Sequence, residues 1–380
     1  MNNSIFQTIA SDKQARTGVL KTKSTHVETP HFMPVVTRFN QNTIGPMDYY
    51  TLGAGSEQCL AYSAVICNSL IYYFDHIKDL NHRDERSIQQ FLNRKKCIFT
   101  DSGGFQTSHF SPIRSEKLPS GILFKDPFSQ REILLTPKIS MQIQKQMDCD
   151  VAMALDDMPN WNSSISNFEK AIYRSKEWAE QCCESKSNNG QLLFGICQGG
   201  EYENLRRKSA LINNQLEFDG IALGGIALCP EQSTRKKMVE FSLPFIDESK
   251  IRYVMGVGNP IDILNMVSMG IDLFDAAYPT IEAKRLNYIS RFGITNLLTG
   301  KNICKIIKQS QCSCFLCETD DIISLLADPK NKLGLLTKLC QVHNLQFMNN
   351  LMTDIRAAIA NHDFSQFREE FNLTFNVTNF

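Results

Sequence analysis

The sequence predicts a (β/α)8 barrel, and three observations support this prediction. Eight short apolar runs recur along the chain, as expected of strands buried on both faces of a parallel sheet. Patterns typical of helices lie between most of these runs. The 380 residues also match the length of a barrel with insertions. A doubly wound sheet is the second choice, because it uses the same alternation of strands and helices.

The expected strands end repeatedly in Gly, Asp or Asn. In chain order they cover 31–36, 63–68, 97–101, 150–156, 192–198, 220–225, 252–258 and 270–275. Between them, the segments 164–185, 205–214 and 259–270 have the pattern of helices. The long gap between the third and fourth strands contains GILFKDPFSQREILLTP, which we expect to form an inserted hairpin near 120–137.

After the eighth expected strand the sequence becomes rich in basic residues and then in cysteine. We therefore divide the chain into a barrel core at 1–280 and a second region at 281–380. Residues 281–308 contain six Lys or Arg and one acidic residue. Three clustered cysteines and a helical pattern at 343–360 follow. We expect this region to form a small subdomain whose C-terminal helix packs on the barrel.

Composition restricts the class of protein. The formal net charge is zero, so any binding of nucleic acid must come from a local basic patch. The first residues lack the pattern of a signal peptide, and no apolar stretch is long enough for a membrane span. Most of the 13 cysteines stand singly in apolar runs, which indicates reduced thiols and a cytoplasmic protein.

Polar residues and glycines gather at the ends of the expected strands, where the chemistry of such barrels takes place. These residues are Asp101 with SGGFQ, Asp156, Gln198, Gly224 with Gly225, Met255 and Asp275. Any one of them could simply cap the next helix or close a turn. Together they favour a planar, purine-like ligand, with Phe105 and Met255 stacked on its two faces. Two carboxylates near one carbon could act as nucleophile and general acid or base.

The motif CSCFLC places Cys312, Cys314 and Cys317 at a spacing that favours a metal site, although three reduced surface thiols are the alternative. A closed tetrahedral site needs a fourth ligand.

An ordered set of motifs resembles the tRNA-guanine transglycosylase family. The motifs are FTDSGGFQ, FGICQGG, FDGIALGGIA, YVMGVG, GIDLFDAAYPT and CSCFLC followed by HNL. The resemblance implies a (β/α)8 barrel with a zinc subdomain. It also implies exchange of guanine at the wobble position of a tRNA anticodon for a free 7-deazaguanine base. A homodimer is expected, with a heterodimer as the alternative.

The resemblance implies a role for each matching residue. Asp275 matches the nucleophile that attacks the ribose, and Asp101 matches the general acid/base. Asp156, Gln198 and the backbone of Gly225 match the groups that read the base edge. Phe105 and Met255 match the residues on either side of the base. Further expected base-binding residues from the same motifs are Ser102, Gly103, Gly104 and Gly224.

The family resemblance also completes the metal site. His343 lies at the family's position for the fourth ligand, after Cys312, Cys314 and Cys317. Three thiolates and one imidazole saturate one zinc ion, so we expect a structural metal with no part in the chemistry.

The sequence departs from the family pattern after the expected nucleophile. Ile281 and Lys284 stand where the family usually has two arginines that contact the anticodon loop. Lysine cannot reproduce the bidentate contacts of arginine. We expect Lys284, Arg285 and Arg291 to bind RNA through its phosphates.

Two positions bear on the identity of the incoming base, and they point in different directions. Leu228 leaves little room for the cyclopentenediol of queuine, whereas FDAAYPT resembles queuine-salvaging members. We therefore favour a smaller 7-deazaguanine precursor slightly over queuine.

Three other functions compete with an active transglycosylase. A non-catalytic subunit of a heterodimer would have lost nucleophile or base-binding groups, yet Asp275, Asp101, Asp156 and Gln198 are all present. A relative acting on DNA or on another tRNA would suit the altered segment after Asp275. An unrelated metabolic barrel enzyme would leave the cysteine cluster unexplained.

Overall fold

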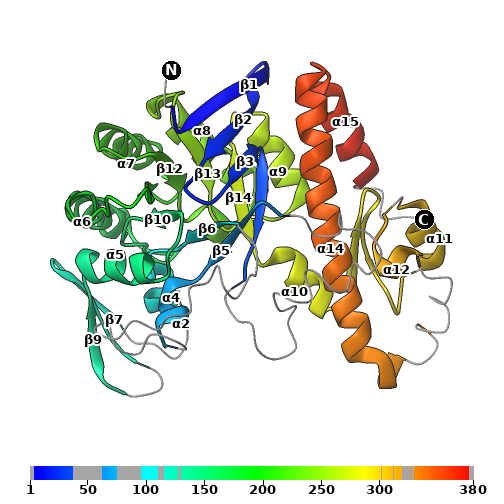
Figure 1. The fold of residues 1–380 in the computed structure, drawn as a ribbon, viewed down its shortest axis with the longest axis horizontal. Helices are drawn as coiled ribbons and strands as arrows, with labels where there is room; N and C mark the ends of the chain where they lie inside the picture. The colour runs from blue at the N-terminus through cyan, green and yellow to red at the C-terminus, as the bar shows by residue number, and fades with distance from the viewer. Residues whose placement is uncertain are drawn as a thin grey trace.

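The computed structural model describes residues 4–36, 62–74, 96–109, 115–126, 130–300, 302–310, 312–318, 326 and 329–375 (Figure 1). Its central sheet has eight parallel strands, and each falls within or beside an expected apolar run. They are β4 (His31–Pro34), β5 (Ala64–Cys67), β6 (Cys97–Thr100), β10 (Val151–Met153), β11 (Leu192–Cys197), β12 (Gly220–Leu223), β13 (Ile251–Val254) and β14 (Leu273–Ala276).

The sheet curls into a barrel. The strand order is β4-β14-β13-β12-β11-β10-β6-β5, and the two outer strands meet through an isolated parallel bridge between Val35 and Ile66. The backbone N–H of Val36 donates to the carbonyl of Ile66 at 2.9 Å. The predicted barrel is therefore confirmed, and the doubly wound alternative is wrong, because an open sheet would leave β4 and β5 apart.

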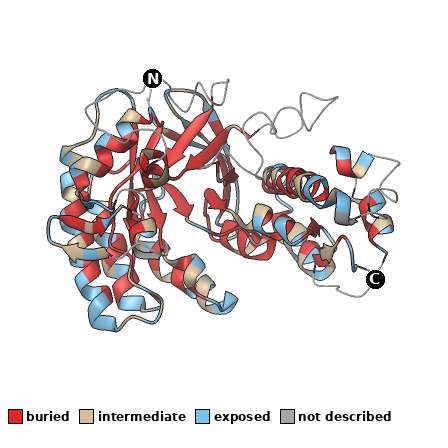
Figure 2. Ribbon diagram, turned by 90° about the horizontal axis from the view of Figure 1, so that it is seen from below, coloured by how far each residue is buried: buried red, intermediate tan, exposed pale blue. Residues whose placement is uncertain are grey.

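Both faces of the barrel strands are buried, which explains their continuous apolar sequences. An inner core lies within the barrel and includes Met33, Phe99 and Tyr253. A larger outer core lies between the strands and the surrounding helices, and it extends to the C-terminal region. Figure 2 shows the buried strands enclosed by helices whose outer faces are exposed.

Helices follow most of the strands. They are α2 (Ser69–Tyr72), α4 (Gly104–His109), α5 (Pro137–Gln146), α6 (Ile165–Glu184), α7 (Glu203–Gln215), α8 (Gln232–Ser242), α9 (Pro260–Val267) and α10 (Tyr278–Lys284). The predicted helices at 164–185, 205–214 and 259–270 correspond to α6, α7 and α9. Local sequence sets their starts: the Ser164 side chain caps α6, and Asn259 followed by Pro260 begins α9.

Three small sheets surround the barrel. β1 (Phe6–Asp12), β2 (Ala15–Lys21) and β3 (His26–Thr29) form an antiparallel sheet beside one end. β7 (Ser115–Leu118), β8 (Gly121–Lys125) and β9 (Glu132–Leu135) form another, and β8 and β9 pair antiparallel within the segment expected to be a hairpin. Residues 127–129 of that segment lie outside the described residues. β15 (Asn287–Ser290) and β16 (Gly293–Asn296) form the third sheet.

The C-terminal region is organised around one long helix. Its helices are α11 (Ile303–Gln309), α12 (Phe315–Glu318), α14 (Pro329–Ala360) and α15 (Phe364–Phe375). On the barrel side α14 contacts β1, β2 and β4, and it also contacts α10, α12 and β15 (Figure 1). Within the described part of the chain, no helix combines the length and apolar character needed to cross a membrane.

Candidate functional site

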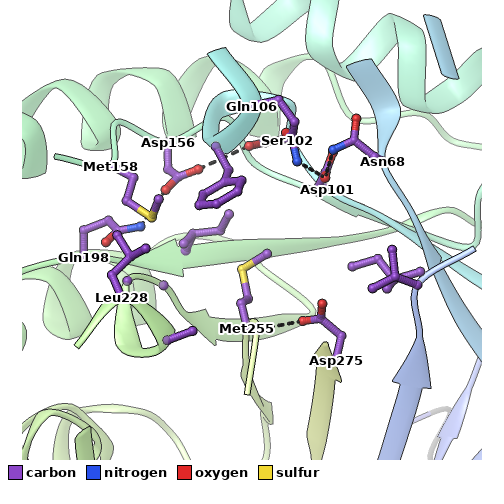
Figure 3. Close-up of a pocket in the computed structure, with 18 of the residues that line it drawn as sticks. Asn68, Asp101, Ser102, Gln106, Asp156, Met158, Gln198, Leu228, Met255 and Asp275 are labelled. Carbon is purple, nitrogen blue, oxygen red and sulfur yellow. Dashed lines mark hydrogen bonds between the residues drawn. The ribbon is translucent and has the colours of Figure 1, made fainter. Parts of the chain in front are cut away.

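A cavity of about 430 Å³ opens at the C-terminal ends of the barrel strands (Figure 3). Its volume lies in the range of small-molecule sites, roughly 300–1,000 Å³. The polar groups at its wall belong to Asn68, Asp101, Ser102, Gln106, Asp156, Gln198 and Asp275. The predicted Phe105, Gly224, Gly225 and Met255 also line it. The closure of the barrel therefore brings together residues from seven strand ends.

Asp275 lies near the end of β14, with its side chain at the cavity wall. One carboxylate oxygen, Oδ1, accepts hydrogen bonds from the Tyr253 hydroxyl at 2.5 Å and from the Gly256 N–H at 2.9 Å. Burial raises the pKa of Asp275, and these two hydrogen bonds oppose the rise. Both described bonds go to Oδ1, which leaves Oδ2 as the oxygen that can attack a bound ligand.

Asp101 follows β6 and also faces the cavity. Its Oδ2 accepts hydrogen bonds from the amides of Asn68, at 2.6 Å, and Gln106, at 2.9 Å. Burial raises the pKa of Asp101 to about 6, against the opposing effect of its hydrogen bonds. A carboxyl group with this pKa can both donate and accept a proton near neutral pH, as general acid–base catalysis requires.

Asp156 and Gln198 form a buried pair on the opposite wall. The Gln198 amide donates to Asp156 Oδ2 at 2.7 Å, and the Ser102 hydroxyl donates to Oδ1 at 3.2 Å. Burial raises the pKa of Asp156, while the Gln198 bond and the charge of Lys117 lower it. This pair offers a carboxylate and a carboxamide side by side, which is suited to the edge of a purine ring.

The Gly224–Gly225 pair lets the backbone come close to Gln198. A Cβ atom on Gly224 would lie 2.3 Å from Gln198 Nε2, so a larger residue would displace the amide. Gly225 has a φ of +73°, in the region that favours glycine. The buried Arg206 guanidinium fixes this loop by donating to the carbonyl of Gly224 at 2.9 Å and to that of Gly200 at 2.7 Å.

The remaining walls are apolar. Phe105 is 45% exposed although it lines the cavity, and Met255 lies in the wall between Gln198 and Asp275 (Figure 3). Met158 and Leu228 narrow the side next to Gln198 (Figure 3). An exposed aromatic ring at such a mouth suits stacking on a planar ligand.

Two of the predicted residues do not line the cavity but hold those that do. The Gly103 N–H donates to Asp101 Oδ1 at 3.2 Å. The Gly104 N–H donates to the Ser102 hydroxyl at 3.2 Å. Gly103 has a φ of +84°, and this turn connects Asp101 to α4.

The predicted RNA-binding residues do not form one cluster. Lys284 and Arg285 are exposed at the end of α10, which begins three residues after Asp275. Arg285 pairs with Glu282 at 3.0 Å. Arg291 is exposed after β15, and its charge lies near Asp354 on α14. Lys284 and Arg285 therefore lie in the segment next to the cavity, and Arg291 lies beside α14.

The four predicted metal ligands lie together. The ligand atoms of Cys312, Cys314, Cys317 and His343 all lie within 4.8 Å of one another. His343 Nδ1 lies 3.5 Å from Cys314 Sγ and 3.2 Å from Cys317 Sγ. A tetrahedral zinc site requires about 3.6 Å between such atoms, so the residues fit this metal.

His343 and its neighbour Asn344 connect the metal site to the barrel. The other ring nitrogen of His343, Nε2, lies 2.9 Å from the carbonyl of Ile289, which assigns Nδ1 to the metal. The Tyr288 ring stacks on His343 at 3.7 Å. Asn344 donates to the carbonyl of Pro279, at the start of α10, at 3.0 Å.

Sequence reasoning assigned no role to Tyr253, Gln106 or Asn344. Tyr253 resembles an ordinary core residue, because it lies within an apolar strand. Gln106 lies in the motif FTDSGGFQ, close to the expected acid Asp101, and Asn344 lies in HNL, directly after the expected ligand His343. Their position beside these residues is the sequence signal that could have identified them.

The chain is similar to known proteins over nearly its whole length. A family profile described as "Queuine tRNA-ribosyltransferase" matches residues 11–376. A queuine tRNA-ribosyltransferase of Thermotoga neapolitana is 33% identical over 366 residues, which cover 96% of each chain. One of Halalkalibacterium halodurans is 32% identical over 379 residues, covering 96% of this chain and 95% of the relative.

Proposed function

The chain belongs to the queuine tRNA-ribosyltransferase family, and from this premise we propose that it exchanges guanine in a tRNA anticodon for a 7-deazaguanine base. The observation that carries the proposal is the single cavity that joins Asp275 and Asp101 to the Asp156–Gln198 pair. A non-catalytic subunit would have no use for this complete set of groups.

In the proposed mechanism Asp275 is the nucleophile. Its carboxylate attacks C1′ of the target ribose, the bond from C1′ to the guanine nitrogen breaks, and an aspartyl ester holds the RNA. Tyr253 and the Gly256 N–H orient Oδ1, so that Oδ2 faces the ribose. Burial makes the Asp275 anion less stable than it would be in water. This favours formation of the neutral ester over the unreacted carboxylate.

Asp101 moves the protons. As a carboxylic acid it gives its proton to the departing guanine nitrogen as the C1′–N bond breaks. As the resulting carboxylate it takes the proton from the incoming base, whose nitrogen then attacks C1′ and releases Asp275. The pKa of about 6 suits both directions of this transfer.

The Asp156–Gln198 pair and the backbone of Gly225 read the base edge in this proposal. Asp156 accepts from the guanine-type N–H groups, and the Gln198 amide is held in place by Asp156. Phe105 and Met255 stack on the two faces of the base. Met158 and Leu228 favour a small 7-deazaguanine precursor over queuine, because both reduce the space beyond the Gln198 amide.

Zinc would be held by Cys312, Cys314, Cys317 and His343 and would act only on structure. Four protein ligands leave no position for water or substrate. The link from His343 through Asn344 to Pro279 supports the start of α10, close to Asp275. The dimer implied by the resemblance stays a prediction.

Base exchange tests the proposed function directly. Purified protein is incubated with radiolabelled guanine and bulk tRNA, and in parallel with DNA. We expect label in tRNA alone, and its subsequent release when an unlabelled 7-deazaguanine is added. Label in DNA would support the alternative of a DNA-modifying relative, and label in neither would reject the transfer reaction.

A further inference from the structure

The two oxygens of Asp101 are held differently. Oδ1 accepts from two backbone N–H groups, those of Ser69 at 2.9 Å and Gly103 at 3.2 Å, and from the Ser69 hydroxyl at 3.1 Å. In the part of the chain that the structure describes, the donors to Oδ2 are side-chain amides, those of Asn68 and Gln106. Among the described residues no group accepts a hydrogen bond from Asp101. This arrangement therefore satisfies the carboxylate but not the carboxylic acid.

The acid form needs an acceptor for its proton, and the arrangement of donors indicates where that proton sits. Oδ1 is enclosed by two backbone donors that cannot turn. At Oδ2, the Asn68 amide is fixed as well, because its Oδ1 accepts from the Ile71 N–H at 2.7 Å and caps α2. Turning Asn68 would leave that N–H without its cap.

Gln106 is the remaining partner of Oδ2, and only the nitrogen of its amide takes part in this contact. Its Oε1 is buried and has no hydrogen-bond partner among the described residues. A buried acceptor without a partner costs free energy, so its presence beside a catalytic carboxyl group calls for a reason. The side chain lines the cavity, where it can turn about its last torsion, which has two nearly equivalent orientations (Figure 3).

We propose that Gln106 is the positioning residue for the Asp101 proton: its Nε2 donates to Oδ2 of the carboxylate and, after a half-turn, its Oε1 accepts the O–H of the acid. This inference rests on the proposed function, in which Asp101 alternates between the two forms. The proton is thereby kept on Oδ2 between exchange events. When the departing base takes the proton, the amide turns back and donates to the new anion.

Other titratable groups face Asp101 without explaining this arrangement. They are the Cys67 thiol from β5, the Tyr253 hydroxyl from β13, Asp275 from β14 and Asp156 beyond β10. Burial raises the pKa of Cys67 and that of Tyr253, so both stay neutral near pH 7. All four groups are unchanged in a variant at position 106, so a comparison at that position isolates the amide.

The test uses two substitutions that act in opposite directions. Gln106→Met keeps the length of the side chain but removes both the donor and the acceptor. Both forms of Asp101 then lose a partner, but the bond to the charged carboxylate is the stronger one, so the pKa of Asp101 should rise by about 0.5–1 unit. Gln106→Lys keeps a donor, adds a positive charge and cannot accept, so the pKa should fall. The shift in Gln106→Met decides between a positioning role and a role in filling space, because a positive charge at this position lowers the pKa of Asp101 whatever the amide does.

Two measurements report this pKa. One is the infrared band of the protonated carboxyl group, identified by its loss in Asp101→Asn and followed against pH. The other is the limb of the pH–rate profile for guanine exchange that Asp101 controls. In Gln106→Met this limb should move to higher pH. Gln232→Met, the same substitution at an exposed residue outside the cavity, should leave it in place.

The outcomes separate this inference from the proposed function. If wild type exchanges guanine but the Gln106→Met and Gln106→Lys titrations match that of wild type, the role of Gln106 is wrong and the function stands. If wild type exchanges no guanine, the function fails, and the infrared titration still decides whether Gln106 controls the proton of Asp101. An unchanged band in Gln106→Met would overturn the inference in either case.

Discussion

At the scale of single residues, the carboxylates of the cavity are distinguished by their partners. Asp275 receives two donors on one oxygen, and Asp101 receives donors on both. Burial raises the pKa of each, but the different arrangement suits one to attack carbon and the other to move protons. In the proposed mechanism, two carboxyl groups of the same type thus acquire different chemistry from their surroundings.

We predict that Asp275→Asn lowers exchange by about 10³-fold or more, because an amide cannot act as the anionic nucleophile. With the incoming base withheld, wild type should form an adduct with tRNA that survives denaturing electrophoresis, and the variant should form none. Asp272→Asn is the matched control. Asp272 lies just before the same strand but pairs with Arg16, so this variant should lose stability and keep the adduct. An adduct in Asp275→Asn would refute the nucleophile assignment.

Because the pKa of Asp101 is raised, the free energy of unfolding should depend on pH. The folded protein holds this proton with a pKa of about 6, against 3.8 for an unperturbed aspartate. The folded state is therefore favoured by this group at low pH, and the advantage is lost as pH rises through 6. Between pH 5 and 8, Asp101→Asn should gain at most about 1.4 kcal/mol relative to wild type. Urea unfolding across this range measures the difference, and a difference that does not vary with pH would contradict the assigned pKa.

At the scale of elements, the strands were predictable and the pairing of side chains was not. Eight apolar runs identified all eight barrel strands, because burial on both faces leaves a continuous apolar sequence. Residues at the strand ends were found because a parallel barrel collects those ends at one mouth. The contact of Tyr253 with Asp275 depends on how neighbouring strands are staggered, which no local pattern encodes.

The long helix shows a second limit of prediction. The sequence indicated a helix at 343–360, whereas α14 begins at Pro329. Its first turns include Asn331 and Gly334, which are poor helix formers. Packing of α14 on α10, α12 and β15 compensates for this weak propensity, and such tertiary contacts are invisible to a local pattern.

The helix α10 carries the departure from the family pattern. Ile281 is 43% exposed there, six residues after Asp275. We predict that wild type discriminates weakly between minihelices with U-G-U and U-G-C in the loop, and that Ile281→Arg sharpens the preference for U-G-U by roughly ten-fold. Leu298→Arg adds the same charge to an equally exposed leucine outside α10, and it should leave the preference unchanged. Equal discrimination by wild type and Ile281→Arg would show that another residue reads the neighbouring base.

At the scale of the whole molecule, the metal site and α14 join the C-terminal region to the barrel. His343 belongs to the group of four residues that could hold a metal ion, while the next residue bonds to the start of α10 and α14 packs on β4. Structural zinc contributes on the order of 10 kcal/mol to the folding of small domains. Loss of the metal should therefore also destabilise the segments that pack around the four ligands.

We predict that Cys317→Ser lowers zinc content below one per chain, the thermal midpoint and tRNA affinity together. Three ligands hold zinc more weakly and no longer fix the segments around it. Cys304→Ser is the control, because Cys304 is a partly exposed cysteine of α11 outside the ligand cluster. Metal analysis, thermal unfolding and filter binding provide the three measurements. Full stability and activity without bound metal would remove the structural role.

The pairing of β4 with β14 has a consequence for the newly made chain. His31 pairs with Leu273, and α14 covers β4 only after residue 360 has been added. At 5–20 residues per second, a ribosome needs roughly 12–50 seconds to pass from β4 to the end of β14, and longer to reach the end of α14. Until β14 has been made, the apolar edge of β4 has no partner strand and is a template for wrong pairing. Slower translation therefore prolongs the exposure of this edge, and faster translation shortens it.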